Sequence, residues 1–584
     1  MFSLICAREM KFTEGKKMEP LEEIKVGPQV KACDTLHSQK YRLPNESFEE
    51  ACSRQAASMA DNEDHRKSYK YILLNQRFMP AGRVQAAMGS PREVTAYNCF
   101  VSGTIKDSMD SIMDRANQAA ETMRRGGGIG FDFSHIRPSG DRIVSLDSSA
   151  SGPVSFMGIF DAVCQTIMSA GHRRGAMMAV LRVDHPDIEE FIRSKRNSNK
   201  LTNFNISVGV TDEFMECVKD DKAFTLQFKN QPYRTINAKA LWDEIMRNNW
   251  DWAEPGVLFI DKINSENPLW YTEKIEATNP CGEQPLPPYG ACLLGSFNLV
   301  KYIYNRKFDF AQFKEDIPHV VRAMDNVIDR TSYPLVKQKM EAQQKRRMGL
   351  GITGLANCLT MCGYKYNSTV GLRFTRKVLK TLMCETYSAS ADLAEEKGSF
   401  KLFNKEKYLS GEFIARLPED IRNKIETNGI RNSHLTSIAP TGTISFTADN
   451  ISSGIEPVWQ YEVNRTVQTE HGPEIIQLRD YVYNNFNLKG ETTDELTVDE
   501  HLNMQIAVQP FIDSAVSKTI NVGSNVSFED FKDIYIKAWK GKLKGVTTFR
   551  IDGKRKGILQ KAEVNEPEGL ACFIDPETGQ KECS

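Results

Sequence analysis

The chain has 584 residues, of which 40% are hydrophobic and 26% charged, as expected for a soluble globular protein with one large domain or several ordinary ones. Its 75 Lys and Arg residues balance 76 Asp and Glu residues to a net charge of −1, so no global basic field favours a nucleic acid as partner. No apolar run of about 18 residues predicts a membrane span, and the N-terminus is too weakly apolar for a secretory signal. Thirteen cysteines with irregular spacing indicate free thiols in a cytoplasmic protein.

The chain divides into three parts by composition. Residues 1–75 are polar and charged, which predicts an N-terminal extension that is mostly helical or irregular. Over residues 76–554 short apolar runs alternate with helical segments, which predicts an α/β fold with a largely parallel sheet covered by helices. Residues 555–584 are rich in Lys, Glu, Pro and Gly, which predicts a mobile tail.

Several elements of the middle part have clear signals. An amphipathic helix is predicted over 107–123, and a second helix over 376–397 is followed by a glycine that would end it. Strands that are apolar on both faces are predicted over 176–183, 204–210 and 256–261.

A glycine-rich stretch over 349–354 matches the G-x-G-x-x-G pattern of dinucleotide-binding proteins. That pattern needs an apolar strand directly before it, and here residues 343–347 read Gln-Gln-Lys-Arg-Arg. We therefore expect a structural glycine-rich turn at this position rather than a dinucleotide site.

The stretch Asn279-Pro-Cys-Gly-Glu283 is the most informative for chemistry. Pro280 favours an extended conformation before it, and side chains at alternate positions of an extended chain share one face. Asn279, Cys281 and Glu283 would then present an amide anchor, a one-electron or nucleophilic sulfur and a general base together. The alternative is a tight turn with a buried cysteine, and spacing alone does not exclude it.

Several segments, in this order along the chain, resemble the ribonucleotide reductases, and the resemblance runs from about residue 78 to 550. One of them, Asn279 to Glu283, resembles the family's finger loop. The others are Tyr97-Asn98-Cys99, RRGGGIGFDFSHIRP with Gly128 inside it, SAGHRRGAMMAVLRVDHPDIEEFI, Ala291 to Leu299 with Cys292 inside it, Ala439 to Ser445, and NISSGIEPV.

The resemblance implies a ten-stranded α/β barrel around the finger loop and a thiyl-radical reaction. Cys281, as a thiyl radical, would remove the 3′ hydrogen of a ribonucleotide, expected to be a diphosphate. Glu283 would take the 3′-hydroxyl proton, and Asn279 would bind the ribose hydroxyls. Cys99 would protonate the leaving 2′-hydroxyl and end as a disulfide with Cys292.

The resemblance also implies a phosphate-binding turn at a helix start. Threonine and serine hydroxyls and outward-facing amides can hold an anion at a helix N-terminus without a lysine. The alternative is a plain helix cap. The expected substrate-binding residues are Asn98, Gly128, Pro440, Thr441, Gly442, Thr443, Ile444 and Ser445.

The source of the radical is predicted from one strand. Family members that use a separate radical-generating subunit carry a Tyr-Tyr pair late in the barrel, and Thr547 and Thr548 stand at the matching positions. Because threonine cannot relay a radical, we expect adenosylcobalamin to generate it at Cys281, with no metal other than its cobalt. The alternatives are the large subunit of a class I reductase and a non-catalytic nucleotide-binding regulator, which would not need three placed cysteines.

Regulation follows the same resemblance. Asp107 and Arg137 match positions that bind a deoxynucleotide or ATP as specificity effector, and the loop over 195–203 matches the one that reports the effector to the active site. The effector sites of the family form at a dimer interface, so a homodimer is expected, although the apolar stripe of helix 107–123 could instead be core. No resemblance to an ATP-cone domain is found, so overall control by dATP is not expected.

Two further cysteines lie in the tail. Cys572 and Cys583 could carry electrons from a thioredoxin-type reductant to the buried disulfide by thiol exchange. The alternative is two incidental surface cysteines.

Overall fold

The computed structural model of the chain describes most residues from Val26 onward. Over part of these segments only the backbone is described. The described residues are 26–169, 173–174, 176–196, 200–469, 472–550, 552–554, 572–574 and 581–583, with backbone alone at 168–169, 173–174, 464–469, 472–476, 572–574 and 581–583.

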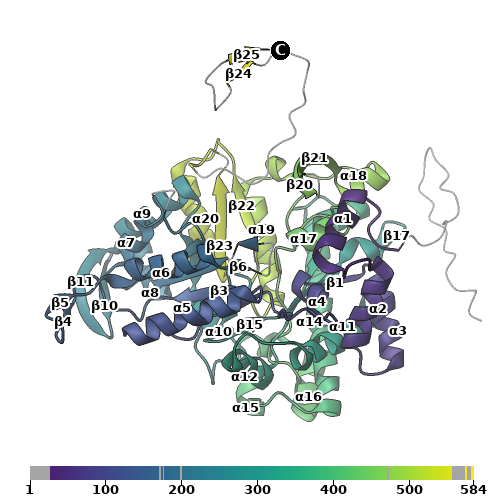
Figure 1. Cartoon of the computed structure of the whole chain (residues 1–584), viewed down its shortest axis with the longest axis horizontal. Coiled ribbons are helices and arrows are strands. Elements are labelled where there is room, and N and C mark those ends of the chain that lie inside the picture. The colour runs from purple at the N-terminus through teal and green to yellow at the C-terminus, as the bar shows by residue number, and fades with distance from the viewer. Residues whose placement is uncertain are drawn as a thin grey trace, which may run out of the picture.

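An eight-stranded sheet forms the centre of the molecule and confirms the α/β prediction (Figure 1). Five neighbouring strands are parallel: β2 (Cys99–Val101), β3 (Gly128–Asp132), β8 (Met177–Arg182), β9 (Phe204–Val210) and β12 (Gly256–Phe259). At one end β15 (Ala291–Cys292) pairs antiparallel with β2. At the other end β23 (Gly545–Arg550) pairs antiparallel with β12 and parallel with β22 (Thr519–Val522).

A three-stranded sheet continues from β15. Its strands are β1 (Phe78–Pro80), β16 (Leu294–Asn298) and β19 (Gly349–Thr353), and β16 pairs parallel with β19. A single residue separates β15 from β16, so the chain passes directly from the larger sheet into the smaller one.

The strands predicted to be apolar on both faces are largely buried. β9 has the predicted bounds, and β8 is one residue shorter at each end than predicted. The third prediction was partly wrong, because β12 ends at Phe259 and residues Ile260–Ser265 form helix α10.

The glycine-rich stretch was predicted wrongly as a turn. Residues 349–353 form the buried strand β19, and only Gly354, with φ 76°, turns the chain. A Cβ on Gly351 would overlap the backbone carbonyl oxygen of Ser437, so the glycine permits close packing of neighbouring strands.

Both predicted long helices are present. Helix α5 (Met109–Arg124) is capped by Ser108, whose side chain accepts from the Ser111 N–H at 3.3 Å. Helix α14 (Thr369–Lys397) begins earlier than predicted and ends before Gly398. Other helices of the structure include α6 (Gly152–Thr166), α7 (Ile188–Arg193), α8 (Asp212–Lys219), α9 (Ala238–Trp252), α12 (Val336–Lys345), α13 (Leu355–Cys362), α16 (Glu419–Asn428), α19 (Val498–Val508) and α20 (Phe528–Lys540).

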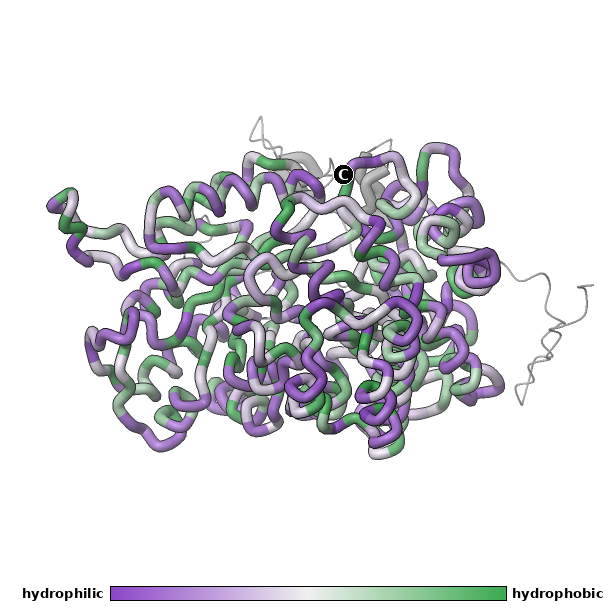
Figure 2. The backbone as a smooth tube through the Cα atoms, turned by 90° about the horizontal axis from the view of Figure 1, so that it is seen from below, coloured by the Kyte–Doolittle hydropathy of each residue, from purple (hydrophilic) through white to green (hydrophobic). Residues whose placement is uncertain are grey.

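Three helices precede the first strand. The second and third of them pack beside α11 (Phe310–Arg330), and the first packs against α4 (Gly82–Ala87) (Figure 1). Asn326 on α11 donates to the backbone oxygen of Met59 at 2.8 Å, which ties this region to the core. Hydrophilic and hydrophobic stretches alternate along the outer helices (Figure 2), as amphipathic helices require. The N-terminal helices are α1 (Lys31–Tyr41), α2 (Phe48–Met59) and α3 (Glu63–Leu74).

The described residues include no membrane-spanning helix, and two short strands pair in the tail. Among the described residues, no helix has both the length and the apolar character needed to cross a membrane. In the tail, β24 (Cys572–Ile574) pairs antiparallel with β25 (Lys581–Cys583), with Cys572 opposite Cys583. The rest of the segment 555–584, where mobility is expected, lies outside the described residues.

Candidate active site

The finger loop joins two short antiparallel strands, β13 (Ala277–Thr278) and β14 (Pro285–Leu286). Its backbone forms a turn, in which the Gly282 N–H donates to the Asn279 oxygen at 3.1 Å. The expectation of an extended chain from Asn279 to Glu283 was therefore wrong. Proline in the second position of a β-turn and glycine in the fourth, here with φ 80°, favour the turn instead.

The turn gives its side chains different surroundings. Cys281 is exposed, and no atom lies within 4 Å of a Cβ built on Gly282, so the tip of the loop faces open space. Asn279 and Glu283 are buried, and the Asn279 side-chain oxygen accepts from the Gln284 N–H at 3.0 Å. The loop thus presents a thiol outward and an amide and a carboxyl inward.

Glu283 is the buried acid of the site, with 2% of its surface exposed. Burial raises the pKa of its carboxyl to about 7, although the Asn279 side chain opposes the rise. Its backbone oxygen accepts from the Ala515 N–H at 2.9 Å and from the Ser437 hydroxyl at 3.0 Å, which fixes the residue in place. A carboxyl with this pKa exchanges protons readily at neutral pH.

Two cysteines face each other on neighbouring strands. Cys99 on β2 lies directly opposite Cys292 on β15, and their thiols are hydrogen-bonded. Burial raises the pKa of Cys292 well above its ordinary value, and Cys99 and Glu283 raise it further. Gly128 lies between the cysteine pair and the finger loop. A Cβ built on it would lie 3.4 Å from the Cys99 sulfur and 3.3 Å from the Pro280 ring, so the pair and the loop are close together.

The strands beneath the finger loop hold it closely. A Cβ on Gly130 of β3 would overlap the carbonyl oxygen of Thr278, so only glycine allows this approach. The Asn205 side chain on β9 donates to the Pro280 oxygen at 3.0 Å. The loop is therefore seated on the parallel strands rather than free in solvent.

Several buried polar atoms near the loop lack a hydrogen-bond partner within the described part of the chain. They include the side-chain oxygen of Asn98, one carboxyl oxygen of Glu283 and both polar atoms of Gln284. Because unsatisfied buried groups are costly, this cluster indicates a site for a polar ligand. The sequence prediction missed Gln284, although its place beside the motif was a usable signal.

The predicted phosphate turn begins helix α17 (Gly442–Phe446). Thr441 adopts φ 55°, and its hydroxyl contacts Thr353 at 2.9 Å and accepts from the Gly454 N–H at 2.7 Å. The Ser445 hydroxyl donates back to the Thr441 oxygen at 2.8 Å. Both hydroxyls therefore already have partners within the protein, and their expected role in binding substrate stays a prediction.

Other parts of the turn remain open to a ligand. Gly442 is exposed, with no atom within 4 Å of a Cβ built on it, and the first N–H groups of a helix lack intrahelical partners. Pro440 is exposed, Thr443 is half-buried, and Ile444 is buried in a hydrophobic cluster. The groups that the turn leaves available to an anion are thus its first backbone amides.

Neither threonine of β23 can relay a radical, because an aliphatic hydroxyl is not oxidised at biological potentials. Thr547 is exposed. Thr548 is buried and contacts the Tyr535 hydroxyl at 2.9 Å and the Asn249 side-chain oxygen at 2.5 Å. Both positions therefore carry small side chains that resist oxidation.

The expected effector residues lie together at the start of α5. Arg137 contacts both carboxyl oxygens of Asp107 at 3.0 Å, and Lys229 lies 3.3 Å from one of them. Burial alone would raise the pKa of Asp107, but the bonds from Arg137 outweigh it and lower the pKa. Of the expected reporting loop, residues 197–199 lie outside the described residues, and Lys195 forms an ion pair with Glu254 at 2.5 Å.

Comparison with known proteins identifies the class. A model of the ribonucleotide reductase barrel domain matches residues 97–498 and 459–549. The chain therefore belongs to the ribonucleotide reductase family.

Within that family, the chain is more similar in sequence to some named reductases than to others. A protein of Mycobacterium tuberculosis strain H37Rv named vitamin B12-dependent ribonucleoside-diphosphate reductase is 35% identical over 93% of this chain and 79% of its own length. A protein of the same name from Thermoplasma acidophilum is 37% identical over 80% of this chain and 63% of its own length. The ribonucleoside-diphosphate reductase large subunit of vaccinia virus is less similar, at 26% over 66% of the chain and 56% of its own length.

Proposed function

We propose that this protein reduces ribonucleoside diphosphates to 2′-deoxyribonucleotides by a thiyl-radical reaction that depends on adenosylcobalamin. The names of the similar relatives support the reaction and the cofactor. The observation that carries the proposal is the exposed Cys281 on a turn seated beside the opposed thiols of Cys99 and Cys292.

We further propose that residues 76–554 form one ten-stranded barrel, with 1–75 as a helical extension and 555–584 as a redox tail. Two isolated parallel bridges support this arrangement: Leu350 to Thr436, and Ile438 to Val516. They link β19 through residues 436–438 to the segment that leads into β22. The finger loop would then lie inside the ring.

The proposed reaction uses the described residues in turn. The Cys281 sulfur radical takes the 3′ hydrogen of the ribose, and Glu283 accepts the 3′-hydroxyl proton. Cys99 donates a proton to the 2′-hydroxyl, which leaves as water. Cys99 and Cys292 then supply two electrons and form a disulfide, and the Cys292 proton completes the C2′ hydrogen that replaces the hydroxyl. Glu283 returns its proton to the 3′ oxygen, and return of the 3′ hydrogen regenerates the Cys281 radical. Asn279 and Asn98 would bind the ribose, and the α17 amides the diphosphate.

The residues fit adenosylcobalamin as the source of the radical. The open space at Cys281 and Gly282 leaves room for a large group over the thiol. When bound, the cofactor supplies the one-electron chemistry that produces the Cys281 radical. The class I alternative requires oxidisable side chains where Thr547 and Thr548 stand, which disfavours it.

The same proposal includes three partners of the enzyme: a nucleotide effector, a protein reductant and a second copy of the chain. Asp107 and Arg137 would bind a deoxynucleotide or ATP effector, and a thioredoxin-type reductant would restore the cysteines through the tail. On α5, Ile112, Ala116 and Met123 are buried in the core, whereas Met109 and Met113 are 56% and 49% exposed. We infer a homodimer that covers the exposed methionines. Ten cysteines whose side chains the structure describes form no disulfide, which supports a cytoplasmic location.

Anaerobic reduction of cytidine diphosphate with dithiothreitol tests this proposal. We expect product only when adenosylcobalamin is added, and none from Cys281→Ser, which keeps the shape of the loop. Cys217→Ser on α8, a half-buried cysteine far from the loop in sequence, is the matched control and should retain activity. Activity that requires an added metal-bearing subunit instead of cobalamin would contradict the proposal.

A further inference from the structure

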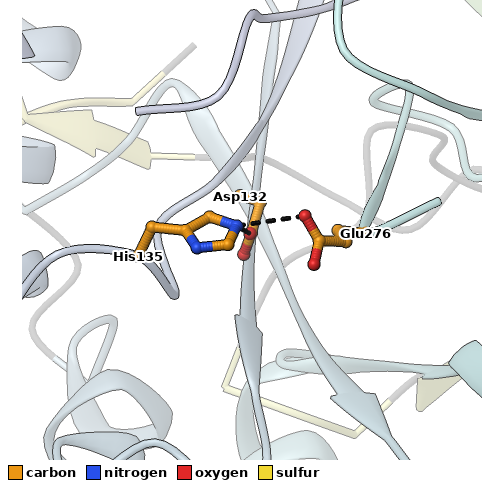
Figure 3. Close-up of side chains that lie close together, drawn as sticks. All are labelled: Asp132, His135 and Glu276. Atoms are coloured by element: carbon orange, nitrogen blue, oxygen red, sulfur yellow. Dashed lines mark hydrogen bonds and ion pairs between the residues drawn. The ribbon is translucent and has the colours of Figure 1, made fainter. Parts of the chain in front are cut away.

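A histidine and two carboxylates meet at the end of β3, outside the proposed reaction. Figure 3 shows the His135 ring pointing between the carboxyl groups of Asp132 and Glu276. The ring Nε2 lies 3.2 Å from an Asp132 oxygen and 3.0 Å from a Glu276 oxygen. Asp132 is the last residue of β3, and Glu276 directly precedes β13, the first strand of the finger loop.

These separations suit a metal ion. Imidazole nitrogen and carboxylate oxygen bind first-row divalent metals at about 2.0–2.2 Å, which places neighbouring ligand atoms about 3 Å apart. The Ser134 hydroxyl and N–H both donate to the other oxygen of Asp132, at 2.5 and 3.0 Å, and so orient that carboxylate. Outer contacts of this kind are typical of metal ligands.

A small cavity adjoins the cluster and offers a further ligand. Its walls include Asp132, His135, Glu276, Ser102 and Pro288. The Ser102 side chain is 7% exposed, and its hydroxyl is without a hydrogen-bond partner in the described structure. This unsatisfied oxygen is the second, independent sign that a polar or charged group belongs in the cavity.

We propose that Asp132, His135 and Glu276 bind a divalent first-row transition-metal ion, with Ser102 and water completing its coordination. The ion would join the end of β3 to the base of the finger loop. This role is separate from the proposed reaction, so the two can fail independently. Without metal, a protonated His135 bridges the carboxylates, which raise its pKa to about 10 although burial opposes the rise.

Manganese binding to the metal-free full chain tests the proposal. Mn²⁺ favours carboxylate and tolerates imidazole, while the thiols elsewhere in the chain are poor ligands for it. We expect one equivalent to bind, with the electron paramagnetic resonance signal of free Mn²⁺ lost on titration. Asp132→Asn and Glu276→Gln should each weaken binding at least tenfold. Glu385→Gln, which removes a half-buried carboxylate paired with Lys314 at 2.8 Å, should leave it unchanged.

A measurement on the unaltered protein removes any dependence on the folding of the variants. Pulsed electron paramagnetic resonance of the bound Mn²⁺ should detect coupling to one imidazole nitrogen. Absence of saturable binding, absence of that coupling, or carboxylate variants that bind Mn²⁺ as tightly as the unaltered chain would each overturn the proposal.

Discussion

At the scale of single residues, Glu283 links chemistry to stability. Its pKa is about 7 in the folded chain, against an ordinary value of 4.5. The folded state therefore binds a proton more tightly than the unfolded state, so this group lowers stability as the pH rises from about 4.5 through about 7. A proton-accepting carboxylate must be ionised, so turnover should rise over the upper part of the same interval.

Glu283→Gln separates the two effects. Reduction should fall by about 10²–10⁴-fold, the usual contribution of a general base. The free energy of unfolding should rise by about 1–3 kcal/mol at pH 8 and change little at pH 5, because the amide never has to ionise while buried. Thermal melting at the two pH values measures this, and a variant destabilised equally at both would show that the carboxylate is structurally required.

At the scale of elements, the fit between β3 and the finger loop has a direct test. Gly130→Ala should displace the loop, because the new methyl group overlaps the Thr278 oxygen. We expect at least tenfold slower turnover and a loss of about 1–3 kcal/mol in stability. Gly209→Ala on β9 is the control, since its Cβ would lie 3.6 Å from Val180, in ordinary contact. Equal activity of the two variants would show that the loop tolerates movement.

The start of α17 can be tested by charge. Gly442→Asp places a carboxylate where the substrate diphosphate is proposed to bind, yet an acid at a helix N-terminus does not disturb the helix. The dissociation constant for nucleoside diphosphate should rise at least tenfold without loss of thermal stability. Gly442→Asn, of the same shape without the charge, should bind nearly as well as the unaltered chain. Calorimetric titration measures the dissociation constants of the variants. Tight binding of the diphosphate by Gly442→Asp would show that the phosphates do not bind at the start of α17.

The sequence predicted strands and helices better than it predicted the site's backbone. Apolar runs carry a strong signal, so β9 was found with its bounds. Residues 349–353 were missed as a strand because the reason for their glycines, close packing against Ser437, lies far away in the chain. The turn at 279–282 was readable from proline and glycine positions, but alternation of side chains was given more weight.

At the scale of the whole molecule, the tail offers a prediction about electron delivery. The backbone register sets Cys572 opposite Cys583, so the two residues lie within the range of separations that a disulfide can bridge. Replacing both by serine should stop repeated turnover driven by thioredoxin, while the first turnover and turnover with dithiothreitol continue. Product counted per enzyme measures this.

The test of the tail needs a control in which two cysteines outside the tail are replaced. Cys217→Ser combined with Cys384→Ser removes two half-buried thiols from α8 and α14 and should leave thioredoxin-driven turnover intact. If the tail variant matches the unaltered chain with thioredoxin, the tail is not the route for electrons.

The α/β class and the largely parallel sheet were predictable, because apolar runs that alternate with helical segments indicate them. The long-range contact between Glu276 and His135 was not predictable, since nothing local in the sequence brings the two residues together. It arises because β3 and β13, which are distant in the chain, lie side by side.

The opposed thiols of β2 and β15 also have a consequence for stability. With both cysteines reduced, mainly backbone hydrogen bonds join these two strands, which come from widely separated parts of the chain. A disulfide there would close a very long loop, and cross-links of that kind stabilise by roughly 3–5 kcal/mol. The free energy of unfolding would therefore rise at each oxidation and fall at each reduction, so that the protein's resistance to unfolding would oscillate once for every product released.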